Sequence, residues 1–325
     1  MATIKDVARE AGLTVTTVSR VLNNRGYISE NARQKVNDAM KKLNYQPNEM
    51  ARSLRKKSNL IGLIVPHIRH PYFAEMISYL EREAYELGYR IMLCNTKDRQ
   101  EREREYVDIC KSNRVAGIII FSGSVEISTF EELEIPVITM ERYLETATAS
   151  VRCDNKTGGV LAARKLIEAG CKNLIHVGSP QSNPELPADD RARGFVETCE
   201  KAGVGYQLIY PDADDDSKLS YADVVEKILK EHSDVDGIFA SSDIIAAQII
   251  QGCHAIGKKI PEDLKLIGFD DILVAEITSP QLTTIHQPIK EMASLAMRLI
   301  EGASEGEVVP RESVLPVRLV ERETV

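Results

Sequence analysis

Side chains that could contact nucleic acid gather between positions 15 and 29 of the chain. Arg20 can donate paired hydrogen bonds to guanine or bind a phosphate, and Val15 and Thr16 can contact the methyl group of thymine. Short polar donors that suit phosphate oxygens lie around them: Thr17, Ser19, Asn23 and Ser29. Any one of these residues alone is equally consistent with a solvated helix position. Together on one short segment, they predict recognition of double-stranded DNA.

The elements that would position these side chains are three short helices. Thr3 and Asp6 have the spacing of a capping box, and Gly12 permits a tight turn after the first helix. Thr14 and Ser29 can cap the second and third helices. Apolar residues follow helical spacing in all three segments: Ile4, Val7, Ala8, Ala11, Val18, Val21, Leu22, Ala32, Val36, Ala39, Met40 and Leu43. This pattern predicts a helix-turn-helix, whose second helix enters the major groove.

The charge of the chain is distributed unevenly. The whole chain has a formal net charge of −8, from 41 Lys and Arg against 49 Asp and Glu. Residues 1–58 hold twelve of the bases and five of the acids, or +7, and the remaining 267 residues carry −15. A basic module on an acidic body is expected when one small domain binds a polyanion. A merely solubilising basic tail would have the same sign, but it would not carry the pattern of a folded domain.

A short segment after the third helix could form one further helical element. Pro47 and Asn48 can begin it, and Leu54 lies between Arg52 and Arg55. An isolated helix needs roughly 12 to 15 residues in water, so this segment is expected to fold only against DNA or a second copy of the chain. A leucine flanked by arginines suits insertion into a minor groove, and Asn48 and Arg52 are expected to contact the same DNA.

From Leu60 onward, short apolar runs alternate with amphipathic segments. Strands are expected at 60–65, 90–93, 117–121, 137–139, 174–177, 207–210, 237–240 and 265–269, with helices near 73–87, 101–110, 194–201, 221–229 and 244–256. A faint internal repeat relates Val115-Ala116-Gly117-Ile118 to Val235-Asp236-Gly237-Ile238, 120 residues later. The pattern predicts two similar α/β lobes with parallel sheets and helices on both faces. Such lobes bind ligands in the crevice at the carboxyl ends of their strands.

Other classes of protein lack support in the sequence. No run reaches the roughly 18 to 20 apolar residues of a membrane span, and the N-terminus lacks the apolar region of a secretory leader, so a cytoplasmic protein is expected. The six cysteines form no C-x-x-C pair and are expected to be reduced. His67 and His70 have no third metal ligand in sequence, and no metal or cofactor is expected. An enzyme is not favoured, because dinucleotide, phosphate-loop and nucleophile-elbow motifs are absent from the sequence.

The N-terminal run TIKDVAREAGLTVTTVSRVLNNRGYIS, with LNYQPNEMARSL after it, resembles the headpiece and hinge of the lactose/galactose repressor family of bacterial transcription factors. The resemblance continues through VRCDNKTGG, DDRARGF, IFASSDIIAAQII and LIGFDDILVAEITSPQLTTIHQP, and it implies a two-lobed core like that of periplasmic sugar-binding proteins. It also implies a homodimer on a near-palindromic operator, with Leu54 in the central minor groove. The implied division is a headpiece of residues 1–46, a hinge of 47–58 and a core of 59–325, with an N-lobe of about 59–158 and 288–315 and a C-lobe of about 159–287 and 316–325.

The same resemblance assigns side chains to the cleft between the lobes. Arg191, three residues before a Gly-Phe pair, and Asp270, in GFDD, match positions that bind ligand hydroxyls, and Phe73 matches an aromatic position. The remaining matches are Asp154, Ser242 and Arg142, and His70 is expected to line the cleft as a donor. Aspartate accepts bonds from neighbouring hydroxyls, arginine donates in a fixed fork and an aromatic ring covers the apolar side of a sugar.

The function that the resemblance implies is repression of a carbohydrate-utilisation operon, controlled by a sugar or a sugar phosphate. A nucleobase effector, a partner protein and a sugar-binding transport protein are alternatives at this point. Whether the effector weakens or strengthens DNA binding is open as well. A homodimer is expected rather than a tetramer, because only six residues follow Leu319.

Overall fold

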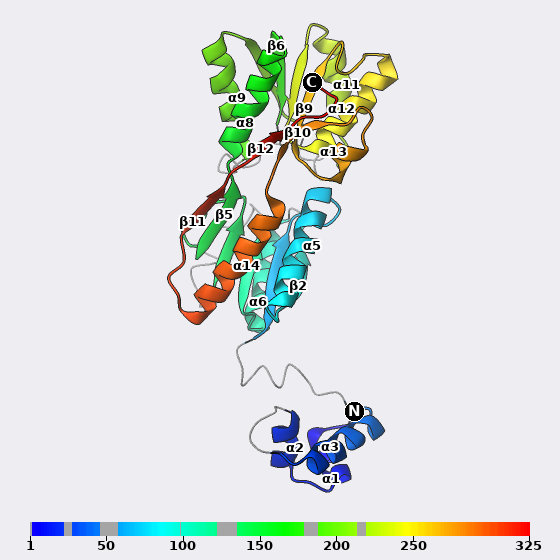
Figure 1. Cartoon of the computed structure of the whole chain (residues 1–325), viewed down its shortest axis with the longest axis vertical. Coiled ribbons are helices and arrows are strands. Elements are labelled where there is room, and N and C mark those ends of the chain that lie inside the picture. The colour runs from blue at the N-terminus through cyan, green and yellow to red at the C-terminus, as the bar shows by residue number, and fades with distance from the viewer. Residues whose placement is uncertain are drawn as a thin grey trace. The chain divides into compact units, whose positions relative to one another are not determined.

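Three short helices and a two-lobed α/β body make up the computed structural model of the chain (Figure 1). The structure describes residues 2–22, 28–45, 58–97, 99–121, 135–178, 188–212 and 219–325. The chain divides into two compact units, Met1–Ser58 and Asn59–Val325. Four residues predicted to contact DNA fall outside the described ranges: Asn23, Asn48, Arg52 and Leu54. Within those ranges, no helix has the length and apolar character needed to cross a membrane.

The first unit is an all-helical headpiece. Its helices are α1 (Ile4–Ala11), α2 (Val15–Leu22) and α3 (Glu30–Lys42). Val7, Val18 and Val36, one from each helix, are 0% exposed and lie in one small apolar cluster. Because each helix alone is too short to be stable in water, this shared core is what holds the three together. The predicted helix-turn-helix headpiece is confirmed.

Local contacts set where the headpiece helices begin and end. The Thr3 hydroxyl accepts the backbone N–H of Asp6, and the Asp6 carboxylate accepts the Thr3 N–H at 2.9 Å, so the predicted capping box is present. Gly12 ends α1 with a φ of 63°, a left-handed conformation that glycine adopts at little cost. The Thr14 hydroxyl accepts the N–H of Thr17 at 3.1 Å at the start of α2.

The first lobe of the core is centred on a parallel six-stranded sheet with the order β11-β5-β4-β3-β1-β2. Its strands are β1 (Leu60–Val65), β2 (Arg90–Asn95), β3 (Gly117–Ile120), β4 (Val137–Met140), β5 (Ala149–Cys153) and β11 (Glu312–Leu315). Among the described residues, this lobe has the helices α5 (Pro71–Glu86), α6 (Gln100–Ser112) and α14 (Ile289–Glu305). Leu63 packs in the cluster of α5 and α14, while Ile64 packs in that of α6. Both faces of β1 are therefore buried, which explains its unbroken apolar run.

The second lobe repeats this arrangement with the order β12-β10-β9-β8-β6-β7, in which only β12 is antiparallel to its neighbour. Its strands are β6 (Asn173–Val177), β7 (Gly205–Ile209), β8 (Gly237–Ala240), β9 (Lys265–Asp270), β10 (Thr283–His286) and β12 (Arg318–Val320). Its helices are α8 (Asn155–Glu168), α9 (Ala188–Ala202), α11 (Ala222–Glu231), α12 (Asp243–Ile256) and α13 (Leu273–Ile277). Phe239 and Phe269 pack with α8 and α9, whereas Ile238 and Leu266 pack with α11 and α12. The predicted α/β lobes with helices on both faces are confirmed.

The chain passes between the two sheets at three places (Figure 1). β5 leads into α8, β10 leads into α14, and β11 leads into β12. Each crossing starts from the carboxyl end of a strand that is parallel to its neighbour: β5, β10 or β11. The carboxyl ends of both parallel sheets therefore point toward the junction of the lobes, which is where α/β proteins place ligands.

The faint sequence repeat has a structural counterpart. Gly117 begins β3, which is fourth in the order of the first sheet, and Gly237 begins β8, which is fourth in the order of the second sheet. A Cβ at Gly117 would lie 3.1 Å from a carbon of Ile300, and one at Gly237 would lie 2.6 Å from a carbon of Leu174. The repeated glycine thus marks the same strand in both lobes, at a point where neighbouring groups come close.

Candidate functional site

The exposed surface of α2 carries part of the predicted DNA-binding set. Val15 is 41% exposed, and Thr16 and Arg20 are exposed as well. Thr17 and Ser19 are half-buried. The most accessible groups of this helix are therefore an apolar side chain, a threonine and a guanidinium, which suit a thymine methyl group and a guanine or phosphate.

Two of the short hydroxyl residues also support the helices. The Ser29 hydroxyl accepts the N–H of Ala32 at 3.3 Å at the start of α3. The hydroxyls of Thr14 and Thr17 lie 2.9 Å apart. A hydroxyl that accepts a capping bond keeps its own proton, so Ser29 can cap its helix and still donate to a phosphate.

At the junction of the lobes, a chain of hydrogen bonds joins the end of β4 to the far lobe. Asn155 Nδ2 donates to Glu141 Oε2 at 2.8 Å, and Arg191 Nε donates to Asn155 Oδ1 at 2.7 Å. Arg191 Nη1 donates to the carbonyl oxygen of Ser241 at 2.6 Å. We call Glu141, Asn155, Arg191 and Ser241 the interlobe relay. Glu141 belongs to the first lobe and Arg191 to the second, and Asn155, at the first crossing between the lobes, bonds to both. The interlobe relay therefore connects the two lobes.

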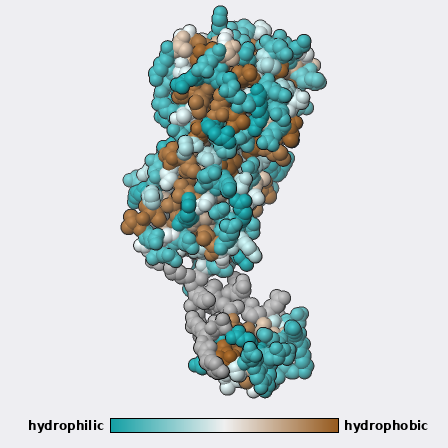
Figure 2. Space-filling view, in the orientation of Figure 1, coloured by the Kyte–Doolittle hydropathy of each residue, from teal (hydrophilic) through white to brown (hydrophobic). Residues whose placement is uncertain are grey.

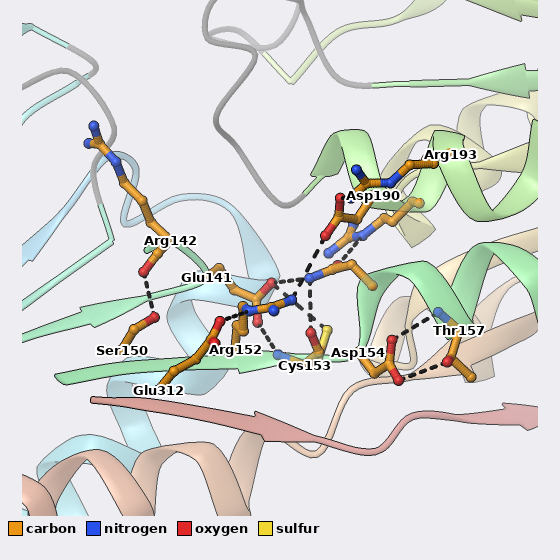
Figure 3. Close-up of polar contacts among 12 residues, drawn as sticks. Glu141, Arg142, Ser150, Arg152, Cys153, Asp154, Thr157, Asp190, Arg193 and Glu312 are labelled. Atoms are coloured by element: carbon orange, nitrogen blue, oxygen red, sulfur yellow. Dashed lines mark hydrogen bonds and ion pairs between the residues drawn. The ribbon is translucent and has the colours of Figure 1, made fainter. Parts of the chain in front are cut away.

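Glu141 is tied to the strand that leads into this crossing. Its Oε1 accepts the backbone N–H of Cys153 at 2.7 Å (Figure 3). Glu141 itself has a φ of 52°, in the left-handed region that a non-glycine residue adopts rarely. Glu141 therefore holds both the last residue of β5 and the first residue of α8.

Arg191 is fixed by an aromatic ring as well as by hydrogen bonds. Its guanidinium carbon lies 3.6 Å from the centroid of the Phe269 ring, and the residue is only 9% exposed. Contact with an aromatic face stabilises a buried cation by about 2 kcal/mol when it is desolvated. Arg191 thus has a defined orientation even without a ligand.

Asp270 ends β9 beside Arg191. It is 3% exposed, it has a φ of 119°, and its Oδ1 accepts a hydrogen bond from Gln287 Nε2 at 2.6 Å. Burial raises the pKa of Asp270 to about 7, although the Arg191 charge and the Gln287 bond act in the opposite direction. Burial and the negative charge of Asp270 likewise raise the pKa of Asp243. The two carboxyls are therefore not both readily ionised.

An aromatic group from the first lobe adjoins these charges. The ring of Phe73 makes edge contacts with His70, Tyr72 and Phe121, at centroid distances of 5.6, 5.2 and 5.7 Å. His70 Nδ1 accepts the N–H of Tyr72 at 3.2 Å, which leaves the proton on Nε2. Burial, with His67 and Arg191 nearby, lowers the pKa of His70 to about 4, so its ring is a neutral donor at pH 7.

Tyr72 links the aromatic group to the charged residues. Burial and the negative charges of Glu141 and Asp270 raise its pKa, while Arg191 lowers it. Such charge effects require the groups to be close, so the structure brings together side chains from both lobes: His70, Tyr72, Phe73, Glu141, Cys153, Arg191 and Asp270. Of the predicted effector residues, this group contains Arg191, Asp270, His70 and Phe73.

The other predicted effector residues have structural partners. Asp154 caps α8, with Oδ1 accepting the N–H of Thr157 at 2.9 Å and Oδ2 accepting its hydroxyl at 2.7 Å (Figure 3). Ser242 caps α12 by accepting the N–H of Ile245 at 3.3 Å. The guanidinium of Arg142 extends away from Glu141 in Figure 3. Ligand contact by Asp154, Ser242 and Arg142 stays a prediction.

Several residues at this junction were not predicted from the sequence, among them Tyr72, Glu141, Asn155 and Gln287. Asn155 directly follows Asp154 in the VRCDN run, and Tyr72 directly precedes Phe73 in HPYF. Each therefore lay next to a predicted residue. Glu141 directly follows β4 and Gln287 directly follows β10, at the carboxyl edges of the sheets where ligand groups are expected. This position was the signal in the sequence that could have identified them.

An ion-pair chain makes a second connection between the lobes. Arg152 Nε lies 2.8 Å from Glu312 Oε1 within the first lobe, and Arg152 Nη1 lies 3.8 Å from Asp190 Oδ2 on α9 (Figure 3). Asp190 also pairs with Arg193, one turn further along α9. These side chains are partly exposed, so the chain contributes little stability compared with the buried interlobe relay.

Comparison with known proteins gave consistent matches along the whole chain. Residues 3–48 match bacterial regulatory proteins of the lacI family, and residues 163–325 match a periplasmic binding protein-like domain. A ribose operon repressor of Halalkalibacterium halodurans is 39% identical, over 100% of this chain and 97% of that protein. A sucrose operon repressor of Streptococcus mutans is 36% identical, over 100% of both chains. A solved periplasmic binding protein/LacI transcriptional regulator from Alkaliphilus metalliredigens, complexed with D-xylulofuranose, is 33% identical with a TM-score of 0.75, over 82% of this chain and 99% of that one.

Proposed function

The chain belongs to the lacI family of bacterial regulatory proteins, and from this membership we propose that it represses a sugar-utilisation operon under the control of a sugar bound between its lobes. It is a DNA-binding transcriptional regulator and not an enzyme. The observation that carries the proposed control is the group of buried and half-buried side chains at the lobe junction. Phe73 and Tyr72 come from the first lobe and Arg191 and Asp270 from the second, so a molecule contacting all four would favour one arrangement of the lobes.

DNA is read by α2 in this proposal. Val15, Thr16 and Arg20 contact base edges in the major groove, while Thr17, Ser19, Asn23 and Ser29 bind the flanking phosphates. The hinge residues Asn48, Arg52 and Leu54 contact the minor groove at the centre of the operator. The exposed positions of Val15, Thr16 and Arg20 on α2 support the first part.

The regulator acts as a homodimer on a near-palindromic operator. Exposed apolar side chains on the core support a partner surface. Leu273 and Ile277, one turn apart on α13, are 66% and 70% exposed, and Leu93 on the edge strand β2 is 45% exposed. Brown atoms, which mark apolar residues, reach the surface of both lobes on the face shown in Figure 2. Two exposed apolar side chains one turn apart, as on α13, suit a contact with a partner chain.

The effector controls DNA binding by changing the arrangement of the lobes. A sugar that donates hydroxyl hydrogens to Asp270 and accepts bonds from Arg191 and His70 would contact both lobes at once. For this to change operator affinity, it must bind the two arrangements unequally, and couplings of about 1–3 kcal/mol are typical.

The first experiment tests DNA recognition. An operator is selected from a library of random duplexes with the full-length protein, and its affinity is measured by fluorescence anisotropy against a scrambled duplex. We expect selective binding that falls steeply with added salt. Arg20→Ala should weaken operator binding at least tenfold, whereas Lys35→Ala, an exposed residue on α3, should change it less than threefold. Equal affinity for both duplexes would refute the proposed function.

The second experiment tests effector control. The protein is screened for thermal stabilisation by D-ribose, sucrose and D-xylulose, and the compounds that bind are added to the operator complex. A ligand at 100 times its Kd stabilises a protein by about 2.7 kcal/mol, which a thermal scan detects. A compound that binds but leaves operator affinity unchanged would show that sugar binding and DNA binding are not coupled.

A further inference from the structure

The buried site at the lobe junction contains more acids than bases. Glu141, Asp243 and Asp270 contribute three carboxyl groups, and Glu75 lies close enough for its charge to act on Asp270. Arg191 is the one basic residue among the groups found to act on Asp270 in the described part of the chain. The half-buried Asp271 is a separate case, because His286 and Arg322 pair with it at 2.9 and 2.7 Å.

The guanidinium of Arg191 already has three partners within the protein. Nε bonds to Asn155, Nη1 bonds to the carbonyl of Ser241, and one face stacks on Phe269. A phosphate is held most strongly by two parallel N–H groups of one guanidinium. With the Nε–H and one N–H of Nη1 in use, the side-on pair of Nε and Nη2 is no longer available to a phosphate, and Arg191 keeps the second N–H of Nη1 and the two of Nη2.

Other basic side chains near the junction do not replace Arg191. Arg142 directs its guanidinium away from Glu141 (Figure 3). Arg69 lies in the exposed loop before α5. The pKa of His70 is lowered to about 4, so His70 is uncharged at pH 7. These three side chains therefore give little support for the phosphorylated effector that the sequence left open.

Three neutral side chains near the junction have a buried polar atom that could bond to a ligand. The Tyr72 hydroxyl, Ser241 Oγ and Gln287 Oε1 are buried atoms with no hydrogen-bond partner among the described residues. Tyr72, Ser241 and Gln287 are 6%, 1% and 1% exposed. A buried polar atom left unpaired costs about 1–3 kcal/mol, so a ligand that supplies hydroxyl groups to these atoms would be favoured.

We propose that the effector is an uncharged polyol and that the lobe junction excludes its phosphorylated counterpart. This inference rests on the proposed function, since it concerns the same effector site. The hydroxyls of a neutral sugar can donate to Asp270 and to Gln287 Oε1 and can accept from Tyr72. A phosphate dianion would add negative charge beside Glu141 and Asp270, in a place where burial already disfavours the ionised form of Asp270. It would also lose its hydration, while the Nε–H of Arg191 is already bonded to Asn155.

The test compares matched pairs on the full-length protein by titration calorimetry: D-ribose with D-ribose 5-phosphate, D-xylulose with D-xylulose 5-phosphate, and sucrose with sucrose 6-phosphate. We expect at least one neutral member to bind and its phosphorylated partner to bind at least 100-fold more weakly. A phosphorylated sugar that binds as tightly as its neutral partner, or more tightly, overturns the proposal.

A measurement with inorganic phosphate covers the case in which no sugar of the panel binds. The melting temperature of the core is compared in phosphate and in chloride of equal ionic strength at pH 7.5. We expect no difference between the two, because Arg191 is the one basic residue found to act on Asp270 among the described residues, and acidic groups outnumber it there. Stabilisation by phosphate that is lost in Arg191→Ala would overturn the exclusion of anions. If no sugar of the panel binds and phosphate also has no effect, the result counts against the proposed function and not against the exclusion of anions.

Variants at an aspartate test whether charge sets the selectivity. Asp270→Asn keeps the shape and the oxygen that bonds Gln287 but removes the negative charge. The ratio between neutral and phosphorylated affinities should fall from at least 100 to below 10. Asp234→Asn, at an exposed position of the same lobe, makes the same chemical change and should leave the ratio unaltered. A ratio that Asp270→Asn does not change would overturn the electrostatic origin of the selectivity.

Discussion

The strongest structural prediction concerns the removal of the Arg191 side chain. In Arg191→Ala, Asn155 Oδ1 and the Ser241 carbonyl lose donors that lie 2.7 and 2.6 Å away, and the Phe269 ring loses a cation 3.6 Å from its centroid. Hydrogen bonds to charged groups contribute about 1.5–3 kcal/mol each, and the two acceptors are left in a site where Asn155 is 0% exposed. Asp270 also loses the cation that favours its ionised form.

We therefore expect Arg191→Ala to lower the free energy of unfolding of the core by about 3–5 kcal/mol. For a unit of this size that corresponds to a melting temperature lower by about 10 °C. Differential scanning calorimetry of the full-length protein measures it, because the headpiece and the core can give separate transitions.

Arg193→Ala is the matched control, since it removes the same side chain from the same helix, two residues away. Arg193 is 57% exposed and pairs with Asp190 at the surface, so its loss should cost less than about 1 kcal/mol. If the two variants melted within 2 °C of each other, the interlobe relay would not be the tightly bonded network that its distances indicate.

The remaining predictions concern other contacts of the two units. Asp270 binds its proton more tightly in the folded state, where its pKa is about 7, than in the unfolded chain, where the ordinary aspartate pKa of 3.8 applies. Its contribution should therefore make the core less stable as the pH rises from about 4 to about 7, and urea titrations at both pH values should show this loss in the wild type and not in Asp270→Asn. Gly159→Ala should destabilise the core by more than about 3 kcal/mol in the same assay, because a Cβ there would lie 2.0 Å from the carbonyl oxygen of Arg191. Thr3→Ala removes the capping box and should destabilise the headpiece by about 1 kcal/mol, measured by circular dichroism. Asn155→Ala should reduce the effect of a bound sugar on operator affinity at least threefold, in anisotropy titrations, while the headpiece still binds the operator.

The fold could be predicted from the sequence because its determinants are local. The alternation of apolar runs and amphipathic segments depends on neighbours within one strand or helix, and the Thr3 capping box spans four residues. The weak repeat at Gly117 and Gly237 is different, because the groups that crowd a side chain there, Ile300 and Leu174, lie far away in the sequence.

The site could be predicted only in part, because its hydrogen bonds join distant positions. Asn155 and Arg191 are 36 residues apart, and Glu141 meets Asn155 across 14 residues that include all of β5. The VRCDN run supplied the predicted residue Asp154, and the neighbouring Asn155, which was not predicted, is the one that joins the interlobe relay. Successive residues at a helix start point about 100° apart, so Asp154 can cap α8 while Asn155 turns toward Arg191. The burial of Asp270 and the hydrogen bonds of Arg191 depend on packing between segments that are far apart in the sequence.

The hydrogen bonds that Arg191 already makes also affect how a ligand could act. The interlobe relay is complete without an effector, so a sugar need not create the connection between the lobes. It can add bonds to the unpaired Tyr72 hydroxyl and Gln287 Oε1, and Tyr72 lies on α5 while Gln287 follows β10 at a crossing. A ligand that joins these two atoms stabilises the arrangement of lobes in which the interlobe relay is intact. Because coupling between two sites is reciprocal, an operator that requires that same arrangement would tighten sugar binding, and an operator that requires a different one would weaken it by the same factor. The sign of the regulation is therefore set by which lobe arrangement the DNA-bound dimer adopts, and not by the chemistry of the sugar site.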